Sequence, residues 1–80
     1  MAREFVHLIF PQNLIKEPVI HTAAQKFDII PNIRRANVTQ TIGEVTLELS
    51  GEKENLKKAK EYLESIGVKV EPLPGDIIDG

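Results

Sequence analysis

The sequence predicts an α+β fold in which two helices cover one face of a four-stranded antiparallel sheet. The first observation is a strict alternation of apolar and polar residues over residues 44–50, which is typical of a strand with one buried face. The second is a helical spacing of apolar residues in two separate segments, which is typical of amphipathic helices. The third is length, because a chain of 80 residues forms one domain with a thin core.

Residues 3–10 predict the first strand, and this strand is apolar on both faces. One face carries Phe5, His7 and Ile9. The opposite face carries Val6, Leu8 and Phe10, with Glu4 as its exposed start. Apolar residues on both faces suggest a central position in the sheet, or a sheet face that a partner chain covers.

The first helix is expected to begin at Glu17 and Pro18, because proline suits the first helical turn and an acidic residue there opposes the helix dipole. It is expected to end near Asp28, since Pro31 disfavours helical backbone just before it. The apolar side of this helix consists of Ile20, Ala23, Ala24 and Phe27. This spacing predicts about three amphipathic turns.

Two strands joined by a turn are predicted next. Residues 32–39 are β-branched and polar, and they predict a second strand whose faces cannot be assigned from the pattern. Ile42 and Gly43 form the turn. Residues 44–50 predict the third strand, and its buried face consists of Val45, Leu47 and Leu49. The register of this third strand is expected to be firm, because a slip by one residue would expose its apolar side chains.

Residues 51–66 predict the second helix, with Gly67 as its C-cap. Val68 and Val70 then predict a short last strand before Pro72. The apolar side of the helix consists of Leu56, Ala59, Leu63 and Ile66. Its solvent side carries the i, i+4 pairs Glu54–Lys58, Lys57–Glu61 and Lys60–Glu64.

The predicted order β-α-β-β-α-β is the split βαβ, or ferredoxin-like, arrangement. The right-handed crossover rule predicts a strand order of 4-1-3-2, with both helices on one sheet face. One domain is expected over residues 3–73, and residues 74–80, which include the apolar pair Ile77-Ile78, are expected to form a flexible tail.

Composition excludes several classes of function. The formal net charge of −2 and the isoelectric point near 5.6 provide no basic surface for nucleic acid, and no apolar run is long enough to span a membrane. The absence of cysteine excludes disulfides, thiol metal ligands and thiol nucleophiles. The N-terminus lacks the apolar segment of an export signal, so a cytoplasmic location is expected.

No catalytic, metal or cofactor site is predicted, and we expect that the protein is not an enzyme. His7 and His21 are interpreted as structural or surface histidines, because no motif near either completes a set of ligands or catalytic groups. Glu44 and Glu48 resemble a carboxylate pair, but solvated carboxylates that face Arg34 or Arg35 across the hairpin are the favoured interpretation.

The candidate binding residues lie on the first and second strands. Phe5, His7 and Ile9 form a partly apolar surface on the uncovered sheet face, and burial in a homodimer is favoured for it. Asn32, near the start of the second strand, offers an amide donor and acceptor to a zwitterionic ligand. The alternative for Asn32 is a hydrogen bond to the backbone of the turn.

The sequence resembles the NIL domain, a small ferredoxin-like module named for an Asn-Ile-Leu motif and found at the C-terminus of the ATPase subunits of bacterial methionine importers. The motif is matched by Asn32 and Ile33, whereas Arg34 stands where leucine is typical. The other matching segments are residues 6–10, 17–20, 27–28, 43, 45–51, 59, 62–63, 67–68 and 70–71.

This resemblance implies an ACT-like regulatory role, in which paired domains bind methionine at their interface. We therefore expect a stand-alone sensor that binds a small amino acid, methionine or a related sulfur compound, between two copies of the chain. Asn32, Ile33 and Arg34 are its expected ligand-binding residues. The alternative is a ligand-free interaction module that acts in trans on an iron–sulfur, sulfur-metabolism or transporter partner.

Overall fold

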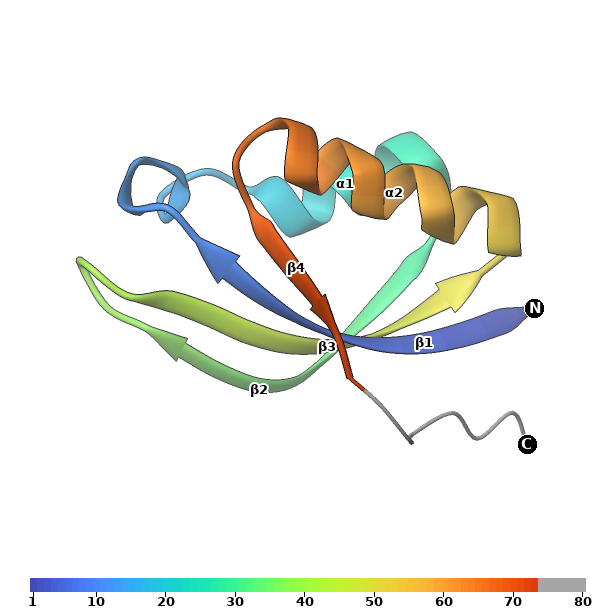
Figure 1. Cartoon of the computed structure of the whole chain (residues 1–80), viewed down its shortest axis with the longest axis horizontal. Helices are drawn as coiled ribbons and strands as arrows, with labels where there is room; N and C mark the ends of the chain where they lie inside the picture. The colour runs from blue at the N-terminus through green and yellow to red at the C-terminus, as the bar shows by residue number, and fades with distance from the viewer. Residues whose placement is uncertain (74–80) are drawn as a thin grey trace.

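Four strands and two α-helices follow one another in the predicted order in the computed structural model, which describes residues 1–73 (Figure 1). The predicted tail at residues 74–80 lies outside the described residues. The elements are β1 (Ala2–Phe10), the 3-10 helix η1 (Gln12–Leu14), α1 (Val19–Phe27), β2 (Ile30–Val38), β3 (Gly43–Gly51), α2 (Lys53–Ser65) and β4 (Lys69–Pro72).

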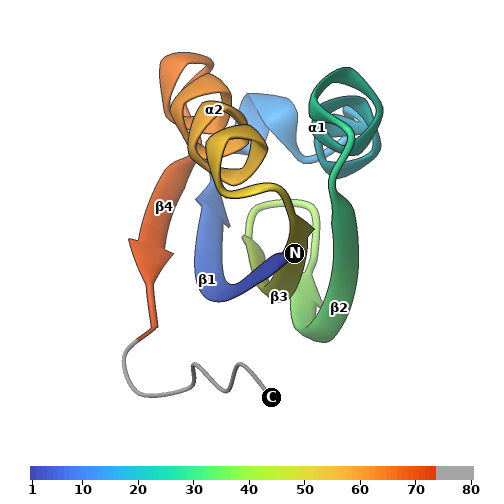
Figure 2. The same ribbon diagram turned by 90° about the vertical axis from the view of Figure 1, so that its right-hand side faces the viewer.

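The sheet is antiparallel with the order β2-β3-β1-β4, which is the predicted order counted from the other edge. Both helices lie on one side of it, as Figure 2 shows end-on. β1 pairs with β3 from Ala2 opposite Gly51 to Phe10 opposite Gly43. The ferredoxin-like fold is therefore confirmed, and the uncovered side of the sheet is called the open face below.

The core lies between the sheet and the two helices. The predicted inward residues of β1 and β3 are buried there except Phe10, which is partly buried, and Leu8 and Leu47 are almost completely inaccessible to solvent. α2 adds its predicted apolar residues Leu56, Ala59 and Leu63. The remaining core residues are Val6, Val19, Ala23, Ile29, Val45, Leu49 and Val68. Period-2 and period-3.6 patterns therefore located most of the core. On α1 they were less accurate, because Ile20, Ala24 and Phe27 are only partly buried and the buried Val19 was not predicted.

The helix ends follow from local backbone chemistry. α1 begins at Val19 directly after Pro18 and ends at Asp28, which has a left-handed φ of 54° and whose N–H donates to the carbonyl of Ala24. Gly67 follows α2 with a φ of 109°, a conformation that glycine adopts without steric cost. The expected ends of both helices are confirmed to within about two residues.

Two sequence expectations differ from the structure. β2 begins at Ile30 rather than at Asn32, so Pro31 lies inside the strand; proline is tolerated there because β2 is an edge strand. None of the three predicted i, i+4 pairs of α2 is an ion pair among the described residues, and Lys60 binds Glu4 of β1 at 2.5 Å instead of Glu64. The side chain of Glu4 therefore joins α2 to β1 instead of lying free in solvent.

β2 is the least covered element of the sheet. The large side chains of Ile30, Ile33 and Val38 are 60%, 57% and 56% exposed. α1 lies above β2 and α2 lies above the other side of the sheet (Figure 2), but the β2–β3 hairpin extends beyond both helices (Figure 1), so part of β2 has no helix over it. Within residues 1–73, no helix is long and apolar enough to cross a lipid bilayer.

Candidate functional site

The three motif residues lie in the middle of the exposed edge strand β2. Asn32 is opposite Glu48 in the register, so it belongs to the open face. Ile33 is opposite the buried Leu47 and therefore belongs to the helix side. Within residues 1–73 the side chain of Asn32 makes no hydrogen bond, so its amide is accessible to a ligand.

A β-bulge directs Arg34 to the open face. The register between β2 and β3 shifts between Ile33 and Arg35, which leaves Arg34 as the extra residue. Its Nη1 donates to Oε1 of Glu48 at 3.0 Å, and its guanidinium carbon lies 6.0 Å from the ring centre of Phe5. Asn32 and Arg34 therefore share the open face, and the bulge explains why the sequence pattern left the faces of this strand ambiguous.

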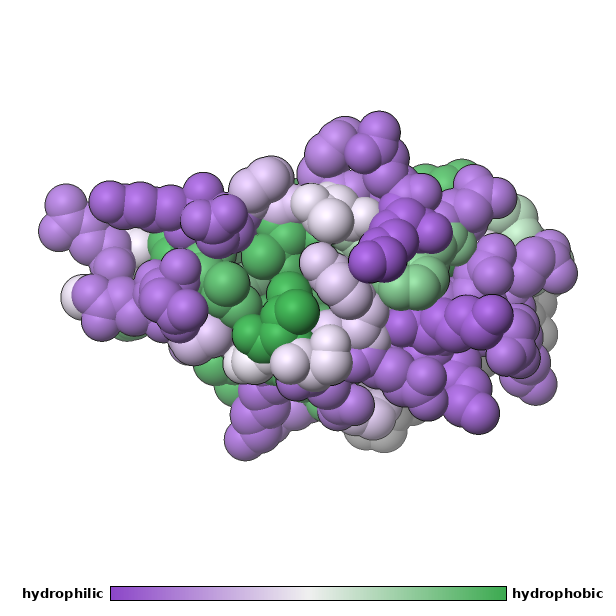
Figure 3. Space-filling view, turned by 90° about the horizontal axis from the view of Figure 1, so that it is seen from above, coloured by the Kyte–Doolittle hydropathy of each residue, from purple (hydrophilic) through white to green (hydrophobic). Residues whose placement is uncertain are grey.

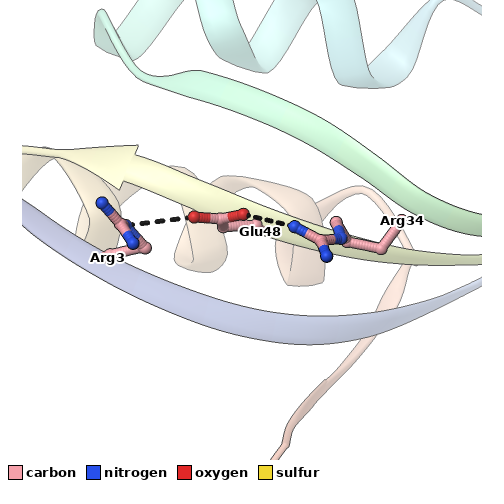
Figure 4. A network of polar contacts seen from close by, with 3 residues as sticks. All are labelled: Arg3, Arg34 and Glu48. Carbon is pink, nitrogen blue, oxygen red and sulfur yellow. Dashed lines mark hydrogen bonds and ion pairs between the residues drawn. The ribbon is translucent and has the colours of Figure 1, made fainter. Parts of the chain in front are cut away.

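Glu48 is shared by two arginines on the open face (Figure 4). Nε of Arg3 lies 3.0 Å from Oε2 of Glu48, while Arg34 binds the other carboxylate oxygen. The Glu48 side chain is only 13% exposed, whereas Arg3 and Arg34 are 49% and 54% exposed. The predicted contact of Glu48 with Arg34 is confirmed, but Glu48 is largely buried rather than solvated, and Glu44 pairs with His7 rather than with an arginine. We call Arg3, Glu48 and Arg34 the arginine cluster.

The predicted dimer surface lies beside the arginine cluster. Phe5, His7 and Ile9 are half-buried on β1, and the register places them opposite Glu48, Thr46 and Glu44. Nδ1 of His7 is hydrogen bonded to Oγ1 of Thr46 at 3.1 Å, and its Nε2 lies 3.3 Å from Oε1 of Glu44. The open face is therefore a mixed surface of rings, aliphatic groups and charges, and burial of its apolar groups by a second chain stays a prediction.

A cavity that sequence reasoning missed lies at the other end of β2. Its volume is about 190 Å³, and it opens between the η1–α1 segment and the β2–β3 hairpin. Figure 3 shows apolar atoms gathered on this part of the helix side, between hydrophilic projections. The lining residues are Phe10, Leu14, Ile15, Glu17, Pro18, Val19, Ile20, His21, Val38, Gly43 and Val45.

The sequence signal for this cavity was the apolar pair Leu14-Ile15 in the segment between the first strand and the first helix. Such a pair needs a packing partner, and here it lines the cavity together with Val38. His21 and Glu17 are the only ionisable side chains among the lining residues. Within residues 1–73, no three His, Cys, Asp or Glu side chains gather closely enough to hold a metal ion.

Comparison with known proteins assigns this combination of fold and motif to a family. The family model of the NIL domain matches residues 4–72. The chain belongs to the NIL domain family. The residues matched to the motif from the sequence, Asn32 to Arg34, lie within the matched region on the exposed strand β2.

The relatives of this NIL domain are parts of importers. It is 33% identical over 72 residues to a methionine import ATP-binding protein MetN 1 of Bacillus cereus, and 32% identical to that of Bacillus anthracis. These matches cover 85% of the chain but 21% of each relative, so the chain spans about a fifth of their length.

A solved structure of the same kind shares the fold. It is the C-terminal domain of an ABC transporter ATP-binding protein from Enterococcus faecalis, with a TM-score of 0.81 and 27% sequence identity. The match covers 91% of this chain and 86% of that one. The ferredoxin-like architecture is therefore shared with a domain of a transporter ATP-binding protein.

Proposed function

We propose that this NIL domain is a regulatory module that binds a small amino acid, methionine or a related sulfur compound, at the interface between two copies of the chain. One observation carries the proposal: the motif residue Asn32 lies unpaired on an exposed edge strand, in a chain whose curated relatives are methionine import proteins. The proposed role is binding and regulation, without catalysis.

The β2 edge is the surface on which we place the contact between copies. A strand at a sheet edge presents unpaired N–H and C=O groups, and a second copy can extend the sheet by pairing with them. β2 is nine residues long and exposes Ile30, Ile33 and Val38, so pairing would also remove apolar side chains from water. The predicted surface of Phe5, His7 and Ile9 is the alternative contact.

Two copies would bring together parts that are far apart in one chain. Asn32 and the cavity residue Val38 are six positions apart on β2, which is roughly 20 Å along a strand. A single amino acid cannot reach both. Antiparallel pairing of two β2 strands places the Asn32 half of one beside the Val38 half of the other, with Asn32 on the open face and Val38 on the helix side. A ligand at Asn32 would therefore contact the open face of both copies rather than the cavity.

The regulatory output follows from linkage. A ligand that binds between two copies stabilises the dimer relative to the monomer by its difference in affinity for the two states. The amide of Asn32 would bind the polar end of the amino acid, and apolar residues at the interface would receive its side chain. The ligand concentration would thereby set the fraction of paired domains.

A second candidate is a ligand-independent protein-binding module for an iron–sulfur, sulfur-metabolism or transporter partner. The arginine cluster favours this candidate, because exposed arginines on a half-apolar sheet face are common at protein interfaces. Affinity capture with and without amino acids discriminates between the two candidates. A heterologous partner that is retained equally in both conditions supports the second.

Thermal unfolding with a panel of amino acids tests the leading proposal. A ligand present at about 100 times its Kd stabilises the folded state by about 2.7 kcal/mol, which corresponds to a rise in Tm of roughly 10 °C or more in a domain of this size. Methionine or a sulfur-containing analogue is expected to give this rise.

Asn32→Ala and Asn55→Ala provide the matched pair of variants. Asn32 lies on the open face of β2, whereas Asn55 lies on α2, away from the proposed contact between copies. Asn32→Ala is expected to abolish the ligand-induced rise in Tm, while Asn55→Ala keeps it. If no amino acid raises the Tm of the unmodified protein at millimolar concentration, the proposal is wrong.

A further inference from the structure

The middle of the β2 edge carries positive charge where a pairing edge would be expected to be apolar. Arg34 is the fifth of the nine residues of β2, and Arg35 follows it. Two β2 strands that pair antiparallel over their full length therefore bring two copies of this arginine pair together near the symmetry axis. Like charges that face each other across paired strands are destabilising.

The local charges do not cancel. Glu48 carries one negative charge and is paired with both Arg3 and Arg34. Arg35 has no ion-pair partner among the described residues. The bulge and Pro31 weaken the same edge further, since charged side chains, proline and bulges are the devices that keep sheet edges from pairing. These features disfavour pairing of the β2 edge with a second copy when no anion is bound.

We propose that Arg34 is an anion-controlled gate for pairing of the β2 edges, which opens when the carboxylate of the bound amino acid neutralises its guanidinium group. This inference deepens the proposed function and rests on it for the identity of the ligand. It concerns Arg34 in particular because Arg34 is the exposed bulge residue at the middle of β2. The gate makes dimer formation depend on a ligand that carries a carboxylate.

Arg34 is well suited to leave its present partner. Its side chain is 54% exposed, so turning toward a ligand requires no repacking. Glu48 remains neutralised when Arg34 moves, because Arg3 holds the other carboxylate oxygen (Figure 4). A planar guanidinium binds a carboxylate through two parallel hydrogen bonds. The amide of Asn32, on the same face of the same strand, can support the polar end of the ligand.

Sedimentation velocity over a concentration series tests the gate, because it measures the dimer Kd directly. The unmodified protein at low salt is expected to be mainly monomeric, and methionine is expected to lower its dimer Kd by roughly tenfold or more. Methionine methyl ester, which lacks the carboxylate, is expected to have no such effect. About 1 M sodium chloride, where the Debye length is about 3 Å, is expected to strengthen pairing without ligand.

The decisive variants are Arg34→Leu and Arg34→Gln, both of which remove the charge. Each is expected to dimerise roughly tenfold or more tightly without ligand than the unmodified protein, and to lose the dependence on salt and methionine. Two variants are used so that a folding defect in one leaves the test intact. Lys69→Leu is the matched control, because it removes a cation from β4, at the opposite edge of the sheet, and is expected to change nothing.

The outcomes separate the gate from the proposed function. The gate is overturned if the Arg34 variants pair no better than the unmodified protein, or if the methyl ester promotes pairing as well as methionine does. The proposed function survives that result if methionine still raises the Tm. If no amino acid raises the Tm, the proposed function fails, while tighter pairing of both Arg34 variants would still support electrostatic control of the edge.

Discussion

At the scale of single residues, the main feature of this NIL domain is a carboxylate that neutralises two cations. Glu48 is the least exposed member of the arginine cluster, so both arginines depend on it for their pairing on the open face. Surface ion pairs each contribute about 0.2–1 kcal/mol, and screening by salt reduces them. Here the two contributions share one partner, so losing Glu48 removes both at once.

Glu48→Gln is expected to lower the free energy of unfolding by about 1 kcal/mol at low salt, because it leaves Arg3 and Arg34 without a counter-charge. Urea unfolding at low and high ionic strength measures the effect, which is expected to shrink as salt increases. Glu61→Gln on the exposed side of α2 is the control and should change little. An equal loss in both variants would contradict the account of the cluster.

At the scale of elements, the two helices and β2 differ in how well their patterns predicted them. Of the four apolar positions predicted for α2, three are buried in the core and the last, Ile66, is partly buried. The pattern of β2 was interrupted by one extra residue at Arg34, and no apolar face remained to indicate which side chains point inward. An element is predictable when one of its sides is buried, because burial imposes the period.

The packing of α2 against the sheet is expected to be sensitive to added volume at Ala59, which is fully buried. Ala59→Leu is expected to destabilise the protein by about 1–3 kcal/mol through overpacking. Lys58→Leu creates the same residue one position earlier, on the exposed side, and is expected to cost less than about 0.5 kcal/mol. Chemical unfolding of the two variants side by side checks this, and equal stabilities would argue against close packing of α2.

At the scale of the whole molecule, the two short helices do not reach the end of the β2–β3 hairpin (Figure 1). α1 lies above β2 (Figure 2), but the hairpin extends beyond the layer that the helices form. The exposed Ile33 and Val38 on its helix side result from this geometry, and so does the opening of the cavity beside the β2–β3 hairpin. The proposed contact between copies would cover exposed side chains of β2 such as Ile33 and Val38.

Ile33→Glu tests whether β2 is the contact between copies. The side chain is 57% exposed, so the monomer should fold with an unchanged Tm, while the dimer Kd measured with saturating methionine should rise by roughly tenfold or more. Ile42→Glu is the control, because Ile42 is 43% exposed but lies in the turn between β2 and β3. If Ile33→Glu leaves the dimer Kd unchanged, the open face of Phe5, His7 and Ile9 becomes the preferred contact.

Most of the fold could be predicted, but only part of the candidate site. The motif residues Asn32, Ile33 and Arg34 were identified from the sequence. The contact between Arg34 and Glu48 was also anticipated from the sequence. The pairing of Arg3 with the same carboxylate was missed, because it joins residues 45 positions apart through the register of β1 and β3. The cavity was missed for the same reason, since its walls come from four separate segments of the chain.

The sequence by itself determined the order of the elements, the strand order and the core, because those properties follow from local periodicity and from the chirality of connections. Only the tertiary structure decided which side chains meet on the open face. It also placed the extra residue of the bulge at Arg34 and left β2 uncovered. These features depend on strand register and on how far two helices extend over a sheet, and neither leaves a repeating signal along the chain.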